Sequence, residues 1–247
     1  MGGKRAAWRR VKVQGDRVQD WIEKTNDMKI RGILYSAAMV RAKVAGIKTQ
    51  TRRIAKLNCS GRVFRGGHNW HVADANAVNA CPYGQPGDVL YGKETFYVDY
   101  STFADGGRLP KEKPDWADDN IYYRADGECC QIIPECCCAE VGKPKWRPSI
   151  FMPRWASRIV DEIVEVRLEC LRDITEEGAI AEGIRPLGGN GPNKFTVSFE
   201  NMSMNAPTAK EVYVMLWEAI NGEGSWALNP WVWVIVTKPT DSPATVH

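Results

Sequence analysis

The run of residues 231–237, with the sequence WVWVIVT, constrains the fold of this chain more than any other stretch. A strand with one face in water alternates apolar and polar residues, whereas a continuous apolar run is typical of a strand buried on both faces. The sequence therefore predicts that residues 231–237 form a central strand of a sheet.

The remaining periodic segments are short strands with few helices between them. Further strands are predicted over residues 29–36, 49–51, 89–97, 121–124 and 159–171, the last of these half-exposed, with a turn at residues 85–88. Helices are predicted over residues 37–45, from a cap at Asp173 or Thr175 to Gly183, and over residues 208–220. The core-facing residues are expected to be Met39, Val40 and Val44 in the first helix and Val212, Met215, Leu216 and Ala219 in the third.

These elements show no regular βαβ alternation. The pattern favours a single α+β domain built on a small mixed or antiparallel β-barrel with flanking helices. We expect residues 1–27 to be an N-terminal extension, residues 28–238 to be the domain, and residues 239–247 to be a disordered tail. Long irregular insertions are predicted at about residues 56–86 and 99–145, and another Gly- and Asn-rich loop at residues 187–205.

Charge and hydropathy narrow the choice of compartment and partner. The formal net charge of +3 permits nucleic acid as a partner without demanding it. No apolar run approaches the ~18 residues that a membrane-spanning helix needs. Residues 1–10 are basic but lack the apolar segment of a signal peptide. We therefore expect a cytoplasmic protein that has no membrane partner.

Cysteine is concentrated in one place. Five of the eight cysteines lie between residues 129 and 138. Adjacent cysteines are poor material for a disulfide framework, so reduced thiols or a structural zinc are expected, and no other cofactor is required. The first candidate ligands are Cys129, Cys130, Cys136 and Cys138, and upstream residues that could add to them are Cys59, His68, His71 and Cys81. The alternative is a cysteine-rich surface insertion that binds nothing.

The segment 46–53, with the sequence GIKTQTRR, has the densest chemistry in the chain. Gly46 follows the first predicted helix and is a natural C-cap, and a strand begins three residues later. Lys48 and Thr51 therefore lie at a helix-to-strand junction. A partly desolvated lysine can move a proton, a threonine can act as a nucleophile, and an arginine can hold an anion or a base edge. The alternative is a solvated basic turn.

Two other places carry unusual chemistry. Glu182 lies in the last turn of its predicted helix, where the helix dipole disfavours an acid by ~0.3–1 kcal/mol, so it has a partner or a function, or else it is simply exposed. Residues 146–158 interleave aromatic, Arg and Pro residues, which suits stacking on bases and contact with phosphate. The alternative for that segment is that its tryptophans are core and its arginines surround them.

The order of these blocks resembles the ASCH family, whose domains have a PUA-like β-barrel fold. The matching blocks are S-x-x-M-V-R-A, K-T-Q-T-R-R, Y-G-x-P-G-D, W-R-P-S-I-x-M-P-R-W-A-S-R and N-P-W-V-W-V-I, which together extend over about residues 29–237. They are most similar to the long ASCH proteins of tailed phages and prophages. The resemblance implies a partner that is a nucleoside or a nucleic acid, with RNA favoured over DNA, in the host cytoplasm if the protein is phage-encoded.

A shorter bacterial branch of this family hydrolyses the amide of N4-acetylcytidine with a Lys, a Thr and a Glu. Carried over to this sequence, those residues correspond to Lys48, Thr51 and Glu182. The expected substrate-binding residues are Tyr35, Ser36, Arg52, Arg53, Trp146 and Arg147. Arg52 or Arg53 would orient the base or its phosphate, and Tyr35 or Trp146 would stack on it.

The resemblance implies covalent acyl transfer. In that scheme Thr51 Oγ1 attacks the amide carbonyl, Lys48 accepts the hydroxyl proton, and Glu182 protonates the leaving nitrogen and activates the water that releases the acyl group. The alternative is a non-catalytic module in which Lys48 and Glu182 form an ion pair and hydrogen-bond a base edge. Ribonuclease activity is a third reading that the same basic pocket allows.

Overall fold

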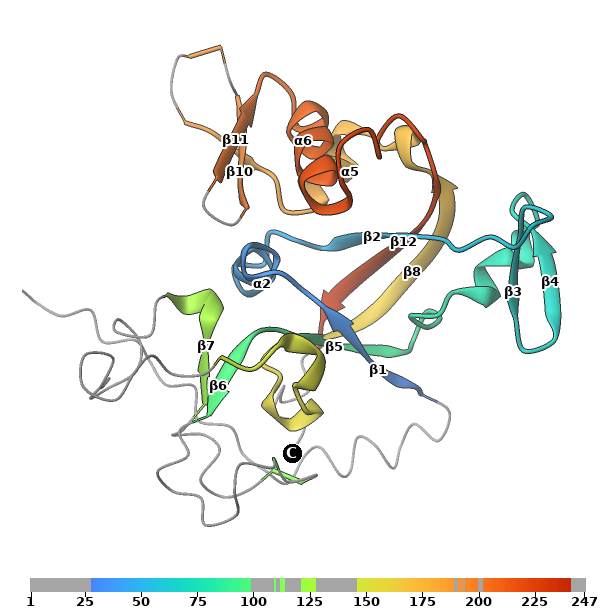
Figure 1. Ribbon diagram of the computed structural model, residues 1–247, viewed down its shortest axis with the longest axis horizontal. Helices are drawn as coiled ribbons and strands as arrows, with labels where there is room; N and C mark the ends of the chain where they lie inside the picture. The colour runs from blue at the N-terminus through green and yellow to red at the C-terminus, as the bar shows by residue number, and fades with distance from the viewer. Residues whose placement is uncertain are drawn as a thin grey trace, which may run out of the picture.

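The computed structural model describes residues 28–98, 109, 112–113, 121–127, 146–188, 191–192, 194–199 and 202–240. These residues form an α+β structure with one five-stranded mixed sheet and three small antiparallel sheets (Figure 1). The predicted extension at residues 1–27, most of the insertion at 99–145 and residues 241–247 lie outside the described residues. None of the helices in the described ranges is long and apolar enough to cross a membrane.

The main sheet confirms the prediction of a central apolar strand. Its order is β1 (Ile30–Leu34), β5 (Val89–Lys93), β8 (Val160–Cys170), β12 (Trp231–Pro239) and β2 (Gln50–Ile54). β1 and β5 are parallel and the other neighbours are antiparallel. β12 lies between β8 and β2 and is buried on both faces: Trp233 and Ile235 enter one core cluster, and Val232 and Val234 enter another.

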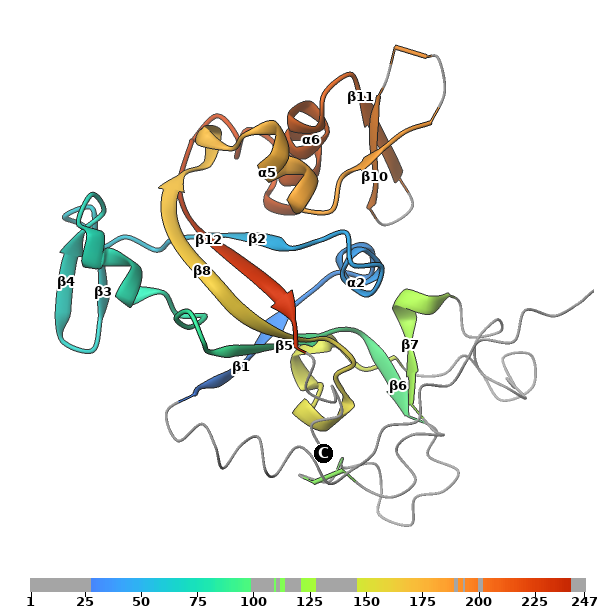
Figure 2. The same cartoon turned by 180° about the vertical axis from the view of Figure 1, so that it is seen from behind.

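The strand pairings of the described residues do not close this sheet into a barrel. Its two edges, β1 and β2, are consecutive strands joined through α2 (Ala37–Val44), which lies beside the gap between them (Figures 1 and 2). Side chains connect the edges instead. Arg53 Nη2 of β2 donates to Leu34 O of β1 at 2.6 Å, and Tyr35 Oη lies 3.4 Å from Thr51 Oγ1.

Helix α2 begins and ends as the sequence predicts. Ser36 Oγ accepts a hydrogen bond from the Met39 N–H, and Gly46 adopts the left-handed conformation with φ of 71°. The N–H groups of the two residues after the C-cap bind the carbonyls of the last turn at 2.9 Å, a Schellman arrangement. The prediction for Val44 was wrong, since that side chain is 59% exposed. The buried position beside it belongs to Lys43, which is held by an ion pair.

A second layer packs on one face of the sheet and contains the C-terminal helices. It comprises α5 (Glu176–Ala181), β9 (Arg185–Pro186), β10 (Phe195–Phe199), β11 (Met202–Ala206) and α6 (Ala209–Asn221), placed above β2 and β12 in Figure 1. Thr175 caps α5, and Thr208 and Glu211 form the predicted capping box of α6. The prediction of an irregular loop at residues 187–205 was wrong, because β10 and β11 pair there as a hairpin.

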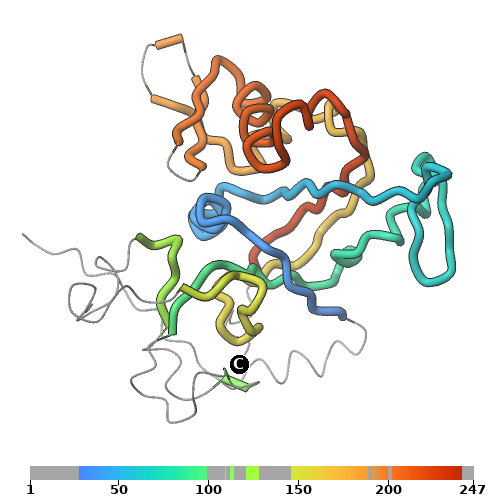
Figure 3. Tube along the Cα trace, viewed as in Figure 1, coloured from blue at the N-terminus to red at the C-terminus, as the bar shows by residue number. Residues whose placement is uncertain are grey.

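The prediction of an irregular region at residues 56–86 was also wrong. Strands β3 (Arg62–Arg65) and β4 (His68–His71) form a hairpin, and the 3-10 helix η1 (Ala75–Ala80) follows. Gly66 and Gly67 have φ values of 58° and 84°, and positive φ at both central residues is the requirement of a type I′ hairpin turn. The Gly-Gly pair between two short strands was the signal for this hairpin. It projects from the end of the main sheet in Figure 3.

The remaining elements form a small unit below the sheet. It contains β6 (Phe96–Val98), β7 (Ile121–Tyr123) and the 3-10 turns η4 (Ser149–Phe151) and η5 (Arg154–Ala156). The turn at residues 85–88 is confirmed by the Asp88 N–H bond to Gln85 O at 2.9 Å. The predicted strand at residues 89–97 is interrupted at Glu94, whose buried carboxylate pairs with Arg158 at 2.8 Å.

Candidate functional site

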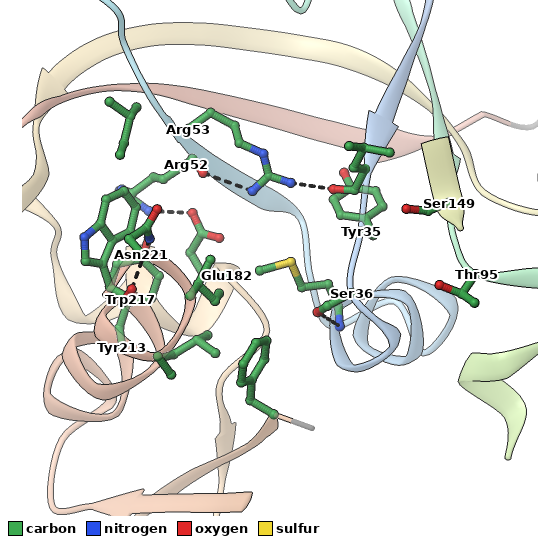
Figure 4. Close-up of a pocket in the computed structure, with 17 residues that line it drawn as sticks. Tyr35, Ser36, Arg52, Arg53, Thr95, Ser149, Glu182, Tyr213, Trp217 and Asn221 are labelled. Carbon is green, nitrogen blue, oxygen red and sulfur yellow. Dashed lines mark hydrogen bonds and ion pairs between the residues drawn. The ribbon is translucent and has the colours of Figure 1, made fainter. Parts of the chain in front are cut away.

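A cavity of about 580 Å³ lies between the open edges of the main sheet and helix α6 (Figure 4). Its walls come from the end of β1, the start of α2, strands β2 and β10, the end of α5, helix α6 and turn η4. The polar and aromatic residues that line it are Tyr35, Ser36, Arg52, Arg53, Thr95, Ser149, Glu182, Phe199, Tyr213, Trp217 and Asn221. Its volume is in the range of small-ligand sites in proteins, roughly 300–1,000 Å³.

Lys48 lies behind one wall of this cavity. Its side chain is inaccessible to solvent, and its Nζ lies 2.5 Å from Glu182 Oε2 and 3.0 Å from Glu182 O. The backbone holds this residue at both ends, as the helix-to-strand junction predicts. Lys48 N–H donates to Ala42 O at 3.1 Å, and Thr49 N–H donates to Ala181 O at 2.8 Å. The Lys48 amine therefore has little freedom to leave its carboxylate partner.

Glu182 presents its carboxylate to the cavity from the C-cap of α5. The helix dipole that disfavours an acid there is offset by two cations, Lys48 at 2.5 Å and Arg52 Nη1 at 3.2 Å. The residue after Glu182 is a glycine, and it allows the end of α5 to approach the segment that carries Ala42 and Lys48 closely. Gly183 has φ of 105°, and a Cβ on it would lie 3.0 Å from Ala42 Cβ and 3.4 Å from Lys48 Cβ. The end of α5 thus packs directly on the segment that carries Lys48.

Arg52 extends this pair into a chain of alternating charges. Its guanidinium binds Glu182 on one side and Glu169 Oε1 of β8 on the other, through Nη2 at 2.8 Å and Nε at 3.2 Å. It also lies over the Tyr213 ring at 5.9 Å. The carboxylates raise the pKa of Arg52 despite its burial, so this cation is permanent. The chain from Lys48 through Glu182 and Arg52 to Glu169 thus contains two cations and two carboxylates. Arg53 adds a further cation at the cavity wall.

The protonation of Lys48 is the adjustable part of this network. Burial lowers its pKa from 10.5 to about 8, against the opposing effect of Glu182, while Arg53 and Lys43 lower it further. The amine is therefore mostly protonated at neutral pH and titrates just above it. Burial also raises the pKa of the Tyr35 phenol and that of the Tyr213 phenol, so both hydroxyls keep their protons.

Thr51 has a different neighbour from the one that the covalent scheme requires. It is 1% exposed, and its Oγ1 lies 3.4 Å from the hydroxyl of Tyr35. Neither Thr51 nor Lys48 lines the cavity; Tyr35 and Glu182, which they contact, do. Between these two described side chains, Lys48 and Thr51, there is no hydrogen bond. The structure brings Lys48 to Glu182 and leaves Thr51 with Tyr35.

The expected substrate-binding residues separate into two groups. Arg53 and Ser36 line the cavity: Arg53 spans the edges of the sheet with its guanidinium 6.0 Å from the Tyr35 ring, whereas Ser36 Oγ is used to cap α2. Arg147 and Trp146 are not among the lining residues. They lie along β6, where Arg147 exchanges backbone hydrogen bonds with Phe96 and Trp146 contacts the Tyr97 ring edge-on at 6.3 Å.

Sequence reasoning missed the wall that α6 provides. Tyr213 and Trp217 lie four residues apart on one face of the helix, together with Leu216, and all three line the cavity. The predicted core face is half correct: Val212 and Leu216 are buried, whereas Met215 is 43% exposed and Ala219 is also exposed. Two aromatic residues at that spacing were the available signal, and the same spacing also suits an ordinary core. Glu169 was missed because half-exposed strands commonly carry acids.

The described part of the chain offers no metal site. Among these residues no group of three or more His, Cys, Asp or Glu side chains could hold a metal ion. Cys59 is exposed and Cys81 is buried, and neither is joined to His68 or His71 in such a group. The primary candidates, Cys129, Cys130, Cys136 and Cys138, lie outside the described residues.

The chain was also compared with known proteins. No protein-family model, no curated protein and no solved structure matches it. The geometry of the cavity and the sequence resemblance are therefore the grounds for any function assigned to it.

Proposed function

We propose that the protein is an ASCH-type amidohydrolase that removes an acyl group from the exocyclic nitrogen of a modified nucleobase of the N4-acylcytidine type. In this proposal the open five-stranded sheet corresponds to the PUA-like barrel of that family, with its two edges connected by side chains. The Lys, Thr and Glu of the resemblance support the assignment because all three are present and buried within one region.

One observation carries the proposal: the Glu182 carboxylate lines a cavity while a lysine amine holds it from behind at 2.5 Å. A carboxylate that borders a cavity can accept a proton from a bound water molecule and return it to a leaving group. Tyr35, Tyr213 and the cation Arg53 line the same cavity. An acid–base group, two aromatic rings and a cation thus border a single space.

The reaction that this arrangement supports is direct hydrolysis. Glu182 removes a proton from water as the water oxygen bonds to the amide carbonyl, and the Arg53 guanidinium stabilises the developing oxyanion. Collapse of the intermediate breaks the carbon–nitrogen bond, and Glu182 returns the proton to the leaving amine. The products are a carboxylic acid and the free amino base. Lys48 is the positioning residue that orients Glu182 through its ammonium.

This route differs from the covalent scheme in the role of Thr51. A threonine nucleophile must reach the carbonyl, and Thr51 is covered by Tyr35, with which it shares a contact. We therefore assign Thr51 to the support of Tyr35. An acyl group on Thr51, detected as added mass in acid-quenched enzyme, would reverse this assignment.

A second candidate function is supported by a specific observation. The Lys48–Glu182 pair is fully formed, and a non-catalytic module that hydrogen-bonds a base edge is expected to contain such a pair. In that case the cavity would bind a modified base without changing it. Product formation separates the two functions.

The test is liquid chromatography of a panel of N-acylated nucleosides incubated with the wild-type protein and two variants. Glu182→Gln removes the proposed acid–base group, and Glu177→Gln removes an exposed acid on the same short helix. We expect deacylation by the wild type and by Glu177→Gln, and none by Glu182→Gln. The absence of product from every panel member with wild-type protein would refute the amidohydrolase and favour the binding module.

A further inference from the structure

The β3–β4 hairpin has two faces of different character. Val63 is buried against η1, and Trp70 packs beside it against the same core cluster. The other face points to solvent. The register pairs Arg62 with His71 and Phe64 with Asn69 there, and all four residues are exposed. Phe64 is 62% exposed.

The charged residues in and just before the hairpin are all basic. Between residues 56 and 73 the chain contains Lys56, Arg62, Arg65 and two histidines, and it contains no acid. Within the described part of the chain, Lys56 and Arg62 form no ion pair. The exposed Phe64 ring therefore shares its face of the hairpin with Arg62, a cation that has no ion pair among the described residues, and the nearest acid along the chain is the exposed Asp74, three residues after His71. An exposed ring beside an unpaired cation is the combination that a polyanion with flat rings would match.

The hairpin is firmly attached, so this face is presented in a fixed position. Arg65 on the buried face donates to Cys81 O, and the His68 and Trp70 rings stack with centroids 5.2 Å apart. Asn58 Oδ1 accepts hydrogen bonds from the backbone of Ser60 and Arg62, which fixes the loop that enters β3.

The hairpin also continues the strand that carries the site. Ile54, at the end of β2, lines the cavity, and Arg62 opens β3 eight residues later (54 to 62). An extended chain of that length spans at most roughly 29 Å. The start of the hairpin is therefore within that distance of the cavity wall.

We propose that the exposed face of the β3–β4 hairpin, formed by Arg62, Phe64, Asn69 and His71, binds single-stranded nucleic acid. Phe64 stacks on an unpaired base, and Arg62 contacts a phosphate. A single strand fits better than a duplex because the faces of its bases are free to stack on one exposed ring. The further consequence, that the cavity acts on a base within a polynucleotide, rests on the function proposed above.

The binding test uses fluorescence anisotropy with a labelled single-stranded RNA of about 12 nucleotides, a length in the range of known single-strand sites. Phe64→Ala should weaken binding by at least roughly fivefold, the low end of the effect of removing one stacked aromatic. Arg62→Ala should reduce the slope of log K against log salt by about 0.7, the value for one phosphate contact on a single strand. The matched controls, Leu228→Ala at an exposed apolar site and Arg185→Ala at an exposed basic site, should bind as the wild type does.

Two sets of outcomes would overturn the binding proposal. One is equal affinity of Phe64→Ala and wild type for the RNA, or no binding by either. The other is equally tight, Phe64-independent binding to duplex DNA or to anionic lipid vesicles, which would show charge attraction alone. Hydrolysis of free nucleosides is measured on the same samples. Phe64→Ala should leave it unchanged, so failure of the cavity chemistry and failure of the hairpin proposal are distinguishable.

Discussion

Two buried lysine–carboxylate pairs, whose lysines are close together in the sequence, differ in what surrounds them. Lys43 and Asp161 are 2.5 Å apart, as are Lys48 and Glu182. Lys43 also donates to Thr237 Oγ1 at 2.5 Å, so the first pair joins α2, β8 and β12 and borders no described cavity. The second pair has Glu182 in the cavity wall.

The comparison shows that a buried ion pair does not by itself identify a functional site. Both pairs satisfy the charges that folding buries, and each would be costly to break on one side. Both carboxylate side chains are almost fully buried, with 6% of Asp161 and 4% of Glu182 exposed, but only Glu182 lines the cavity described above. Position at the cavity wall, rather than ionic chemistry or exposure, is what distinguishes the two pairs, and the following predictions test that distinction from the largest expected effect to the smallest.

The largest effect is expected in catalysis. Glu182→Gln should lower kcat/KM for an N-acylated nucleoside by about 10²–10⁴-fold, the usual contribution of a general acid–base group. Asp161→Asn should leave kcat/KM of the folded fraction within a few-fold of wild type, because Asp161 does not reach the cavity. Equal losses of kcat/KM in the two variants would eliminate the distinction between the pairs.

The next-largest effect is expected on the free energy of unfolding when the Lys43–Asp161 pair is broken. Asp161→Asn leaves Lys43 buried without its counter-charge, so the free energy of unfolding should fall by about 3–5 kcal/mol. The double variant Lys43→Met with Asp161→Leu replaces the pair with apolar groups and should recover most of that loss. Urea denaturation measures both. A double variant as unstable as Asp161→Asn would indicate that Thr237 and its neighbours require the ions themselves.

The pH dependence of the free energy of unfolding should reveal the lowered pKa of Lys48 in the Lys48–Glu182 pair. The pKa of Lys48 is about 8 in the folded protein and 10.5 ordinarily. Between these pH values the unfolded chain binds more protons, so raising the pH stabilises the fold, by as much as about 3 kcal/mol from this group. The double variant Lys48→Met with Glu182→Gln lacks the group and serves as the reference. The wild type should gain stability relative to it from pH 8 to pH 10.5, and a constant difference would contradict the lowered pKa.

The smallest effect is expected at Gly183, whose backbone lets the end of α5 approach the segment that carries Lys48. Gly183→Ala forces a side chain into φ of 105° and against Ala42 Cβ, which should cost about 1–3 kcal/mol of stability and also lower activity by displacing Glu182 from Lys48. Gly188→Ala meets nothing within 4 Å and should stay within about 0.5 kcal/mol of wild type. An active, stable Gly183→Ala variant would show that this approach is not needed.

The sequence predicted the elements whose signals are local. The apolar run of β12, the capping residues of α2, α5 and α6, and the helix-to-strand junction at Lys48 follow from side-chain patterns within a few residues. The two hairpins at β3–β4 and β10–β11 were missed because their strands are too short to alternate clearly. In the β3–β4 hairpin only the turn glycines are a signal. In the β10–β11 hairpin the Gly- and Asn-rich composition is typical of an irregular loop.

The site was predictable in its residue types and less so in its contacts. The sequence indicated Lys48, Thr51 and Glu182, and the ion pair between Lys48 and Glu182 was expected only in the non-catalytic alternative; local patterns do not report either that pair or the contact of Thr51 with Tyr35. Those contacts depend on how α5 approaches α2, which is a tertiary property. The α6 wall was missed for the same reason: whether Tyr213 and Trp217 face a core or a cavity depends on the layer opposite them.

The most direct test of hydrolysis by Glu182 is the pH dependence of deacylation between pH 6 and pH 10. If protonated Lys48 orients Glu182 for attack by water, kcat/KM should fall as the pH rises through about 8, where the amine loses its proton. If neutral Lys48 instead acts as the base for a Thr51 nucleophile, kcat/KM should rise through the same pH. A falling profile supports Glu182 as the base that activates water, and a rising profile contradicts that role.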